Sequence, residues 1–295
     1  MFAFGVADVC HLPLADGAVD LVFGSPPYCD ARTYGIDAQR NCGDWVDWMV
    51  LATREALRVS RGAVVWIAGG VTRKRNYQPA VEGLMYEWWR QGGSMYRPCC
   101  WVKVGIPGSG GDDWFRSDWE FAVCFKRPGR LPWSDNRAMG HPPKYGVGGE
   151  LSHRMRDGAK VNQCGARGSH IGRDRHGRPK PIQAPSHEHV TVGGGRRPLP
   201  AVANPGNVLR IPVGGGHMGD TRAHKNEACF PERLAEFFVR SLCPPNGIVL
   251  DPFSGSGTSV AVAAKCGRRA LGFDLRPSQG VAGRERVDGS QAALF

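Results

Sequence analysis

Two short stretches of the chain carry side chains whose types and spacing could do chemistry. The first, Ser25-Pro26-Pro27-Tyr28, directly follows the apolar run 19–23 and its glycine. Neither proline can donate a backbone hydrogen bond and both fix their own φ, so a strand must end there in a rigid loop. This loop is either a simple strand stop or a polar grip, with an aromatic ring beside it, for a flat substrate.

The second stretch is a glycine-rich turn between an apolar strand and a helix. The strand ends at Asp251, the turn contains Gly255 and Gly257, and the helix begins near Thr258. Glycines let a ligand approach the backbone, and free N–H groups at a helix start bind polar ligand oxygens. Asp274 ends the next strand. In nucleotide-binding folds an acidic side chain at this place accepts hydrogen bonds from ribose hydroxyls.

The spacing of these glycines narrows the class of ligand. It matches neither the GxGxxG of dinucleotide sites nor the GK[ST] ending of a phosphate-binding loop. A ligand that joins a nucleoside to an amino acid, as S-adenosylmethionine does, therefore fits better than a dinucleotide or ATP. A tight strand-to-helix connection without any ligand is the plain alternative.

The elements that must position these residues follow from the pattern of apolar residues. Short apolar runs predict strands, and apolar residues at helical spacing predict helices. The predicted strands are 19–23, 62–68, 98–104, 119–126, 207–211, 247–251 and 269–274, and the predicted helices are 44–59, 81–91, 231–242 and 258–266. From about 128 to 206 periodicity fades and Pro, Gly, Arg and His dominate, which indicates an irregular insert.

The two stretches together resemble the amino-methyltransferases that modify DNA. Ser25-Pro26-Pro27-Tyr28 is similar to their [DNS]-P-P-[YF] catalytic motif, and the stretch 251–258, DPFSGSGT, is similar to their cofactor motif. The order, with the tetrapeptide first, a basic middle and the cofactor motif last, resembles the circularly permuted β-class. The resemblance implies an α/β Rossmann-like fold for S-adenosylmethionine-dependent methyltransferases, with a mixed seven-stranded sheet and helices on both faces. It divides the chain into a catalytic half, 1–127, a target-recognition insert, 128–206, and a cofactor-binding half, 207–295.

The resemblance also assigns roles to single residues. The implied catalytic residues are Ser25, Pro26, Pro27 and Tyr28. The implied cofactor contacts are Asp8, Phe230, Asp251, Pro252, Phe253, Ser254, Gly255, Gly257, Thr258 and Asp274. For two of these a structural role is the alternative: Asp8 as a turn residue, and Phe253 as packing under the glycine turn.

The chemistry of the tetrapeptide agrees with this resemblance. The amino group of a base is a poor nucleophile because its lone pair is delocalised into the ring. Hydrogen bonds accepted from it by the Ser25 hydroxyl and the rigidly held Pro26 carbonyl would free that lone pair. Tyr28 could stack on the base, which must first be rotated out of the duplex. No covalent intermediate is needed, so none of the ten cysteines has to be a nucleophile.

Serine at the first place of the tetrapeptide resembles the cytosine-N4 enzymes, and aspartate there resembles the adenine-N6 enzymes. A neutral serine can donate as well as accept, which suits the acceptor ring nitrogen beside the amino group of cytosine. We therefore favour cytosine N4 as the target. Adenine N6, a non-catalytic DNA-binding protein that keeps the scaffold, and methylation of RNA or another amino substrate are the alternatives.

The charge of the chain points to a polyanionic partner. The net charge is +11, and residues 126–225 hold 18 Lys and Arg against 6 Asp and Glu, so the remainder is nearly neutral. A basic, irregular segment on a neutral body indicates contact with nucleic acid, here double-stranded DNA. The alternative is a solvated insert kept soluble by its charge. The candidate DNA contacts are Lys103, Arg167, Arg173, Arg175, Arg178, Arg196 and Arg197.

Other features of the sequence limit the kinds of protein that this chain could be. No apolar run reaches the length of a membrane-spanning helix, the start of the chain lacks the pattern of a secretory signal, and the cysteines lack regular spacing. We expect a cytoplasmic protein of prokaryotic or phage origin with reduced thiols. Cys164, His170 and His176 fit no common zinc spacing, so no metal is expected. The resemblance leaves open a homodimer and a cognate restriction endonuclease as partners.

Overall fold

The structure is a computed structural model of the chain. It describes residues 1–30, 40–104, 113, 115–142, 150–154, 160–164, 188–190, 196–198, 202–214 and 230–292. The chain divides into two compact units, one of residues 1–139 and 206–295 and one of residues 140–205. Each unit is treated by itself below.

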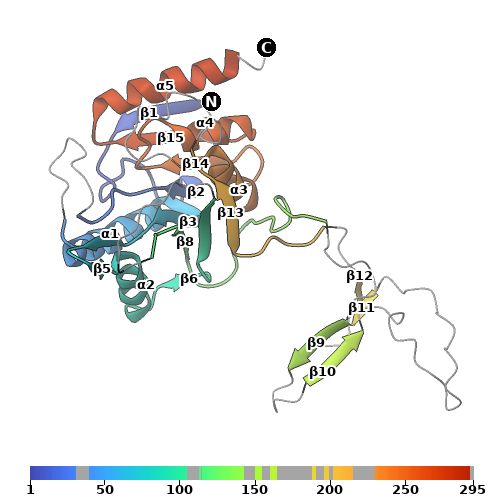
Figure 1. Cartoon of the computed structure of the whole chain (residues 1–295). Coiled ribbons are helices and arrows are strands. Elements are labelled where there is room, and N and C mark those ends of the chain that lie inside the picture. Colours follow the sequence, from blue (N-terminus) through green and yellow to red (C-terminus); the bar gives the residue numbers. More distant parts are fainter. Residues whose placement is uncertain are drawn as a thin grey trace, which may run out of the picture. The chain divides into compact units, whose positions relative to one another are not determined.

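The first unit is built on one mixed sheet, which has nine strands among the described residues (Figure 1). Along the sheet, eight strands follow one another in the order β1 (Phe2–Val6), β15 (Arg269–Asp274), β14 (Ile248–Asp251), β2 (Val19–Gly24), β3 (Ser60–Ala68), β8 (Trp119–Lys126), β7 (Cys99–Val104) and β13 (Val208–Pro212). The short β6 (Ser94–Met95) pairs with β8. The five strands from β1 to β3 are mutually parallel, and β8 runs antiparallel to both of its neighbours in this order.

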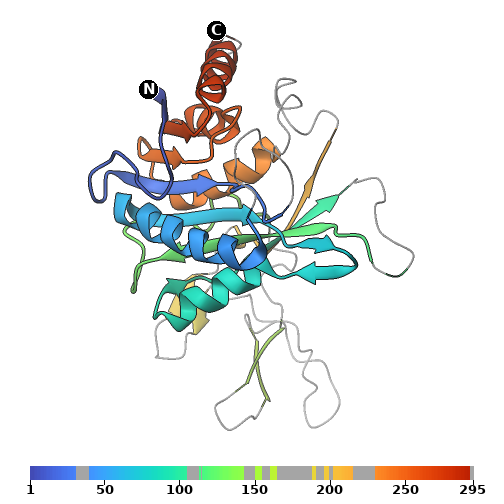
Figure 2. The same cartoon turned by 90° about the vertical axis from the view of Figure 1, so that its left-hand side faces the viewer.

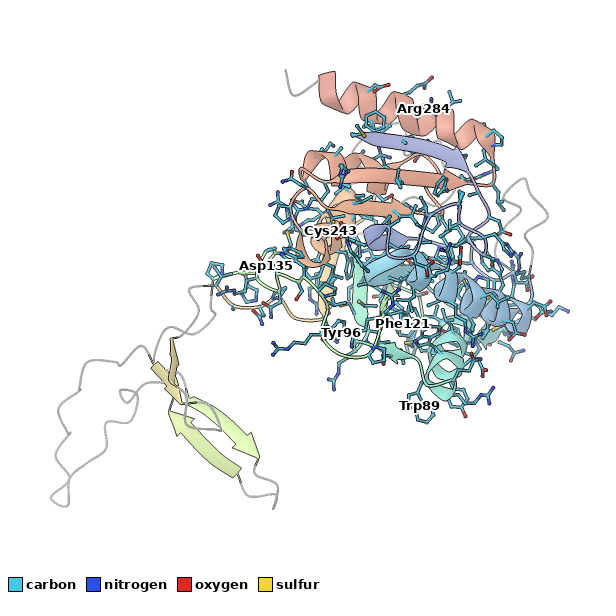
Figure 3. All side chains as sticks on the ribbon, turned by 180° about the vertical axis from the view of Figure 1, so that it is seen from behind. Trp89, Tyr96, Phe121, Asp135, Cys243 and Arg284 are labelled. Atoms are coloured by element: carbon cyan, nitrogen blue, oxygen red, sulfur yellow. The ribbon has the colours of Figure 1, made fainter. Side chains whose placement is uncertain are left out.

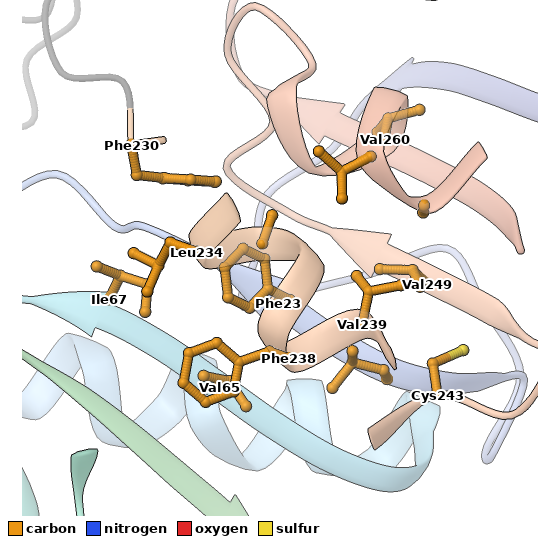
Figure 4. Packing of buried hydrophobic residues seen from close by; sticks show 14 of the residues in the cluster. Phe23, Val65, Ile67, Phe230, Leu234, Phe238, Val239, Cys243, Val249 and Val260 are labelled. Carbon is orange, nitrogen blue, oxygen red and sulfur yellow. The ribbon is translucent and has the colours of Figure 1, made fainter. Parts of the chain in front are cut away.

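Helices cover both faces of this sheet. One face packs against α1 (Cys42–Val59) and α2 (Ala80–Arg90), and the other against α3 (Glu232–Leu242), α4 (Thr258–Lys265) and α5 (Pro277–Ala292). The central strands are mostly apolar because both of their faces are covered, and β2 is buried at every position, including Asp20. Figure 4 shows the packing on the second face, where Phe23 of β2 lies among Phe238 and Val239 of α3 and Val249 of β14.

The order of the strands creates a switch point between β14 and β2. These neighbours are parallel, with Val249 opposite Leu21 and Leu250 opposite Val22. After β14 the chain turns into α4 on one face, and after β2 it continues to α1 on the other face. In open α/β sheets the crevice left at such a point, outside the carboxyl ends of the strands, is where ligands bind.

All seven strands and four helices expected from the sequence are present, with ends shifted by one or two residues. The expected count of seven strands is too low for the sheet, because β1 and β6 were not anticipated. β1 is a short edge strand whose partner, β15, lies at the other end of the chain. β6 has only two residues. Neither gives a pattern that local inspection can detect.

The helix α5 was also not expected. Its sequence contains Gly280, Gly283 and Gly289 and lacks a strong apolar stripe. The glycines allow a close approach instead, since a methyl group added at Gly283 would lie 2.4 Å from the ring of Phe4. Arg284 donates a hydrogen bond of 3.2 Å to the carbonyl oxygen of Phe4, which fastens α5 to β1 (Figure 3). Tertiary packing, and not the helix propensity of its sequence, therefore stabilises this helix.

The second unit contains two antiparallel hairpins in its described part. β9 (Glu150–Arg154) pairs with β10 (Lys160–Cys164), and β11 (Glu188–Val190) pairs with β12 (Arg196–Pro198). Residues 128–139 are grouped with the first unit. The N–H of Asp135 donates a hydrogen bond of 2.9 Å to the carbonyl oxygen of Ser241, and Leu131 packs against the core (Figure 3). A role of the second unit in target recognition stays a prediction.

Candidate active site

The tetrapeptide loop leaves β2 at the switch point and is held by two side-chain hydrogen bonds. The hydroxyl of Ser25 donates to the carbonyl oxygen of Ile67 on β3, at 2.9 Å. The indole Nε1 of the buried Trp45, in the first turn of α1, donates to the carbonyl oxygen of Pro27, at 2.7 Å. Pro26 between them is buried. The loop is thus fixed to a strand on one side and to a helix on the other.

The hydrogen bond of Ser25 changes one part of the sequence argument. The serine proton, which we expected to be available to the ring nitrogen of cytosine, is donated to Ile67. The lone pairs of Oγ remain, and a hydroxyl oxygen can accept from an amino group. Ser25 is therefore arranged as a neutral acceptor, which does not by itself distinguish cytosine from adenine.

Tyr28 lies half-buried at the end of the same loop and packs against the cluster of α1 and α2. A methyl group added at Gly69, just after β3, would lie 3.8 Å from its ring and 3.2 Å from Cγ of Glu120. The buried Glu120 forms an ion pair with Lys103, whose side chain is only 19% exposed and whose Nζ lies 5.5 Å from the centre of the Trp101 ring. DNA contact by Lys103 stays a prediction, because in the structure its ammonium group has an internal partner.

Two carboxylates brace the glycine turn from within. Asp251 accepts hydrogen bonds from the N–H of Phe253, at 2.9 Å, and from the hydroxyl of Ser259. Asp274 accepts from the N–H of Gly255, at 3.1 Å, and from that of Arg276, at 2.9 Å. Both carboxylates thus organise the backbone around the turn.

The N–H groups of the turn itself are mostly bonded within the protein, whereas free N–H groups at the start of α4, near Thr258, stay a prediction. The N–H of Ser254 donates to the carbonyl oxygen of Phe273, at 2.8 Å, and that of Gly257 donates to Ser254, at 2.7 Å. With the bonds to Asp251 and Asp274, four N–H groups between 253 and 257 have protein acceptors. The buried hydroxyl of Ser254 has no hydrogen-bond partner among the described residues, so it is a polar atom that a ligand could satisfy.

Burial dominates the electrostatics of Asp251. The side chain is 1% exposed, and desolvation raises the pKa of its carboxyl from its ordinary value of 3.8 to about 7. The hydrogen bonds from Ser259 and Phe253 lower the pKa, but less than burial raises it. The folded protein therefore holds the proton of this carboxyl much more tightly than an exposed aspartate would.

The switch point brings the two motifs into contact although they are far apart in the sequence. A methyl group added at Gly24, next to Ser25, would lie 2.6 Å from Oδ1 of Asp251 and 3.5 Å from the ring of Phe253. The tetrapeptide loop and the glycine turn therefore begin side by side at the carboxyl edge of the sheet. A ligand bound at the glycine turn and one bound at the tetrapeptide would therefore be neighbours.

Two aromatic residues expected at the cofactor contact other rings. Phe253 is edge-on to Trp48 of α1 at 5.7 Å and to Trp66 of β3 at 5.6 Å. Phe230 is buried and edge-on to Phe23 at 5.3 Å, under the strand that carries the tetrapeptide (Figure 4). Both rings thus have a packing role, and their contact with a cofactor stays a prediction.

The remaining residues that are expected to contact the cofactor lie at the same edge of the sheet. Val6 is opposite Asp274 in the register of β1 and β15, so Asp8 follows the neighbouring strand end. The Asp8 side chain is half-exposed and accepts from the N–H of Cys10, at 3.0 Å. Pro252 and Thr258 are buried within the glycine turn.

One residue that the sequence did not indicate holds the start of α4. Arg286 of α5 is fully buried and donates to the Thr258 hydroxyl, at 2.8 Å, and to Glu232 of α3, at 2.9 Å. The local signal is weak, because an arginine in a glycine-containing tail is usually solvated. Trp45 was likewise missed, since a tryptophan on an apolar helix face is usually a core residue.

Several other expectations concern residues that the structure places only in part. Arg167, Arg173, Arg175 and Arg178 lie outside the described residues, and Arg196 and Arg197 are described only as backbone of β12. Among the side chains that are described, no three His, Cys, Asp or Glu gather as a metal-binding group. Within the same ranges, no helix combines the length and apolar character needed to cross a bilayer.

Two cysteines that follow or precede prolines are poor nucleophiles. Burial raises the pKa of Cys99 to about 11 and that of Cys243 to about 12. Both thiols are therefore protonated at neutral pH, whereas nucleophilic attack needs the thiolate.

Comparison with known proteins decides the family. The family model described as DNA methylase, of the N6 and N4 type, matches residues 19–279. The chain belongs to this family. The match includes both the tetrapeptide and the glycine turn.

Individual relatives and solved structures agree with this assignment. The chain is 30% identical over 98 residues to the type II methyltransferase M.ScaI of Streptomyces caespitosus, a match that covers 32% of each chain. It is 24% identical over 265 residues to the orphan methyltransferase M.BamHII of Bacillus amyloliquefaciens, covering 89% of this chain and 86% of the relative. The matched region therefore spans about a third of M.ScaI but most of M.BamHII.

Two solved structures share the fold. The PvuII DNA methyltransferase, a cytosine-N4-specific enzyme, matches with a TM-score of 0.62 at 16% identity, over 99% of this chain and 91% of that one. The TTHA0409 protein of Thermus thermophilus, solved in complex with S-adenosyl-L-methionine, matches with a TM-score of 0.57 at 23% identity, over 98% and 94%. These matches establish a methyltransferase-type α/β fold for this chain.

Proposed function

We propose that this protein transfers a methyl group from S-adenosylmethionine to an exocyclic amino group of a base rotated out of duplex DNA. The observation that carries the proposal is the contact between the two motifs at the switch point, where Gly24 leaves no room for a side chain against Asp251. Membership of the DNA methylase family supplies the reaction class. The order of the motifs supports the β-class.

The residues of the glycine turn fit a cofactor that joins a nucleoside to an amino acid. Ser254 offers a buried hydroxyl without a partner in the described chain, and Asp274 offers a carboxylate at a strand end. Phe253 offers an aromatic ring beside the turn. When bound, S-adenosylmethionine supplies a methyl group on a sulfonium, which is electrophilic without further activation.

The tetrapeptide binds and activates the acceptor base. The Oγ of Ser25 and the carbonyl oxygen of Pro26 accept hydrogen bonds from the amino group, which favours a tetrahedral nitrogen with a free lone pair. The bonds to Ile67 and Trp45 hold the loop before the base arrives, so little reorganisation is needed during the reaction. Tyr28 stacks on the base outside the duplex.

We favour cytosine N4 over adenine N6 as the target. The support is serine at the first place of the tetrapeptide, which is the pattern of the cytosine-N4 enzymes in the resemblance described above. The geometry of Ser25 as a neutral acceptor is compatible with either amino group. A homodimer and a cognate restriction endonuclease stay predictions of the same resemblance.

The decisive experiment is transfer of radiolabelled methyl groups to mixed-sequence DNA, followed by separation of the nucleosides. We expect label in N4-methylcytosine. Label in N6-methyladenine would overturn the choice of base, and label only in RNA would overturn the choice of acceptor. DNA binding without transfer to any acceptor would favour a non-catalytic scaffold.

The variant Ser25→Ala tests the assigned site within this assay. We expect turnover to fall about 100-fold, as when one preorganised hydrogen bond is removed from an active site, with cofactor affinity nearly unchanged. Ser60→Ala is the matched control, because its hydroxyl also donates to a backbone carbonyl, that of Ala63, but at the opposite edge of the sheet. Near-normal rates in Ser25→Ala would show that Ser25 does not act on the acceptor.

A further inference from the structure

A basic hairpin follows β3, the strand whose Ile67 accepts the hydrogen bond of Ser25. β4 (Val71–Arg73) and β5 (Asn76–Gln78) pair antiparallel directly after β3, and Figure 2 shows them projecting beyond the sheet. Arg73 lies opposite Asn76, so Lys74 and Arg75 form the two-residue turn. All three basic residues, Arg73, Lys74 and Arg75, are exposed. We call these residues the basic tip.

Close packing fixes this hairpin beside the tetrapeptide loop. A methyl group added at Gly70 would lie 2.4 Å from the hydroxyl oxygen of Tyr77, and one added at Gly69 would lie 3.8 Å from the ring of Tyr28. The Tyr77 hydroxyl donates to Glu82 of α2, at 2.7 Å. The base of the hairpin is therefore packed closely at two glycines.

An ion pair joins the tip to the chain just after the tetrapeptide loop. Nε of Arg73 lies 3.7 Å from Oδ2 of Asp30, two residues after Tyr28. Arg75 pairs with Asp113 at 3.0 Å. These contacts place the basic tip at the edge of the sheet where a base held by Ser25 and Pro26 would enter.

The turn has a backbone conformation that its side chains do not favour. Lys74 has φ 46° and Arg75 has φ 63°, both in the left-handed region. Two-residue hairpin turns with positive φ at both positions strongly prefer Asn-Gly, Asp-Gly or Gly-Gly, because long side chains are strained there. Strained backbone of this kind is concentrated at binding sites. The turn thus carries two positive charges at a cost that a neutral turn sequence would avoid.

The charges of the tip are accessible to an anion. The ion pairs of Arg73 and Arg75 are exposed and therefore weak, with side chains of the two arginines 47% and 71% exposed. A guanidinium has five N–H donors, so one carboxylate leaves donors for a second acceptor. Lys74 forms no ion pair with any described residue.

We propose that the basic tip binds the phosphate backbone of duplex DNA next to the base that enters the active site. This proposal rests on the proposed function for the choice of DNA as the polyanion. It adds a DNA contact in the catalytic half, separate from the arginines of residues 140–205. The contact positions the DNA and does not read its sequence, since phosphates carry no base information.

The test exchanges the turn for one that suits the backbone better. In the variant Lys74→Asn with Arg75→Gly, thermal stability should be equal or higher, because Asn-Gly relieves the strain. Binding to a fluorescently labelled mixed-sequence duplex is measured by anisotropy at several salt concentrations, without cofactor. We expect weaker binding and a salt slope lower by about 1 for each phosphate that the variant no longer neutralises.

Two further variants keep the result interpretable. Lys74→Gln changes one charge within the same turn and should lower the slope by about 1 even if the double variant folds poorly. Arg130→Gln is the control, because Arg130 is exposed beyond the end of β8, at the opposite edge of the sheet. The salt slope of this variant should equal that of the wild type.

Failure of this inference can be separated from failure of the proposed function. An unchanged salt slope in both tip variants, with methyl transfer intact, would overturn the role of the tip alone. Wild-type protein that binds duplex DNA without any methyl transfer would overturn the proposed function, and a lowered slope in the variants would still support the tip.

Discussion

The indole Nε1 of Trp45 donates a hydrogen bond of 2.7 Å to the carbonyl oxygen of Pro27, and this bond ties α1 to the tetrapeptide loop. Pro27 cannot donate a backbone hydrogen bond, and its carbonyl follows that of Pro26, which we propose as an acceptor for the target amino group. The orientation of one carbonyl constrains the next through the rigid proline. We therefore expect Trp45 to be a positioning residue for the proposed reaction.

Trp45→Phe should lower turnover on the order of tenfold, because small displacements of a reacting group are costly. Cofactor affinity should change little. Trp88→Phe is the matched control, since Trp88 is also buried and donates a similar bond to Ser94, far from the tetrapeptide. Equal losses of turnover in the two variants would point to general destabilisation and against a positioning role.

Gly24→Ala should disturb both motifs at once. The added methyl group would lie 2.6 Å from Oδ1 of Asp251, and that oxygen accepts the N–H of Phe253. We expect a loss of about 1–3 kcal/mol in the free energy of unfolding, as for other overpacked sites, and weaker S-adenosylmethionine binding in calorimetry. Gly206→Ala, where a methyl group meets no atom within 4 Å, should change neither. Wild-type cofactor affinity in Gly24→Ala would contradict the proposed contact.

The raised pKa of Asp251 predicts a specific dependence of stability on pH. The folded chain holds this proton up to about pH 7, whereas the unfolded chain releases it near its ordinary value of 3.8. The stability contributed by the carboxyl is therefore fully present below about pH 4 and is lost as pH rises through about 7.

Urea denaturation of the wild type and of Asp251→Asn, from pH 5 to pH 8, measures this dependence. Stability of the wild type relative to the variant should fall by up to about 1.4 kcal/mol per pH unit below pH 7 and then level off. The variant cannot titrate at this position, so it supplies the baseline. Parallel curves for the two proteins would show that the pKa of Asp251 is not raised.

Arg286 should couple the tail helix to the cofactor turn. Arg286→Met removes its bonds to Thr258 and Glu232. Because Glu232 also pairs with Lys265, we expect a moderate loss of about 2–3 kcal/mol in the free energy of unfolding. S-adenosylmethionine affinity should fall as well. The double variant with Glu232→Gln should lose less than the sum of the single variants if the two residues interact, and strict additivity would contradict the interaction of Arg286 with Glu232.

The sequence alone predicted the family by resemblance, and it predicted the central strands and the helices around them. The local pattern was sufficient because β3 contains a continuous apolar run, 63–68, and because two prolines must end β2 in a loop. The glycine spacing after Asp251 likewise excluded dinucleotide and phosphate-loop motifs without any coordinates. These are properties of consecutive residues.

Only the tertiary structure decided how the site is assembled. The pairing of β14 with β2 places Asp251 against Gly24, and no local pattern specifies which strands become neighbours. The same holds for α5, which forms through contact with Phe4, and for Arg286, whose partners lie on α3 and at the start of α4. The proton of Ser25 also finds its acceptor, Ile67, on a strand 42 residues away in the chain. Contacts between residues distant in sequence depend on packing of the whole sheet, and that is the physical reason why the sequence could name the two motifs but not their geometry.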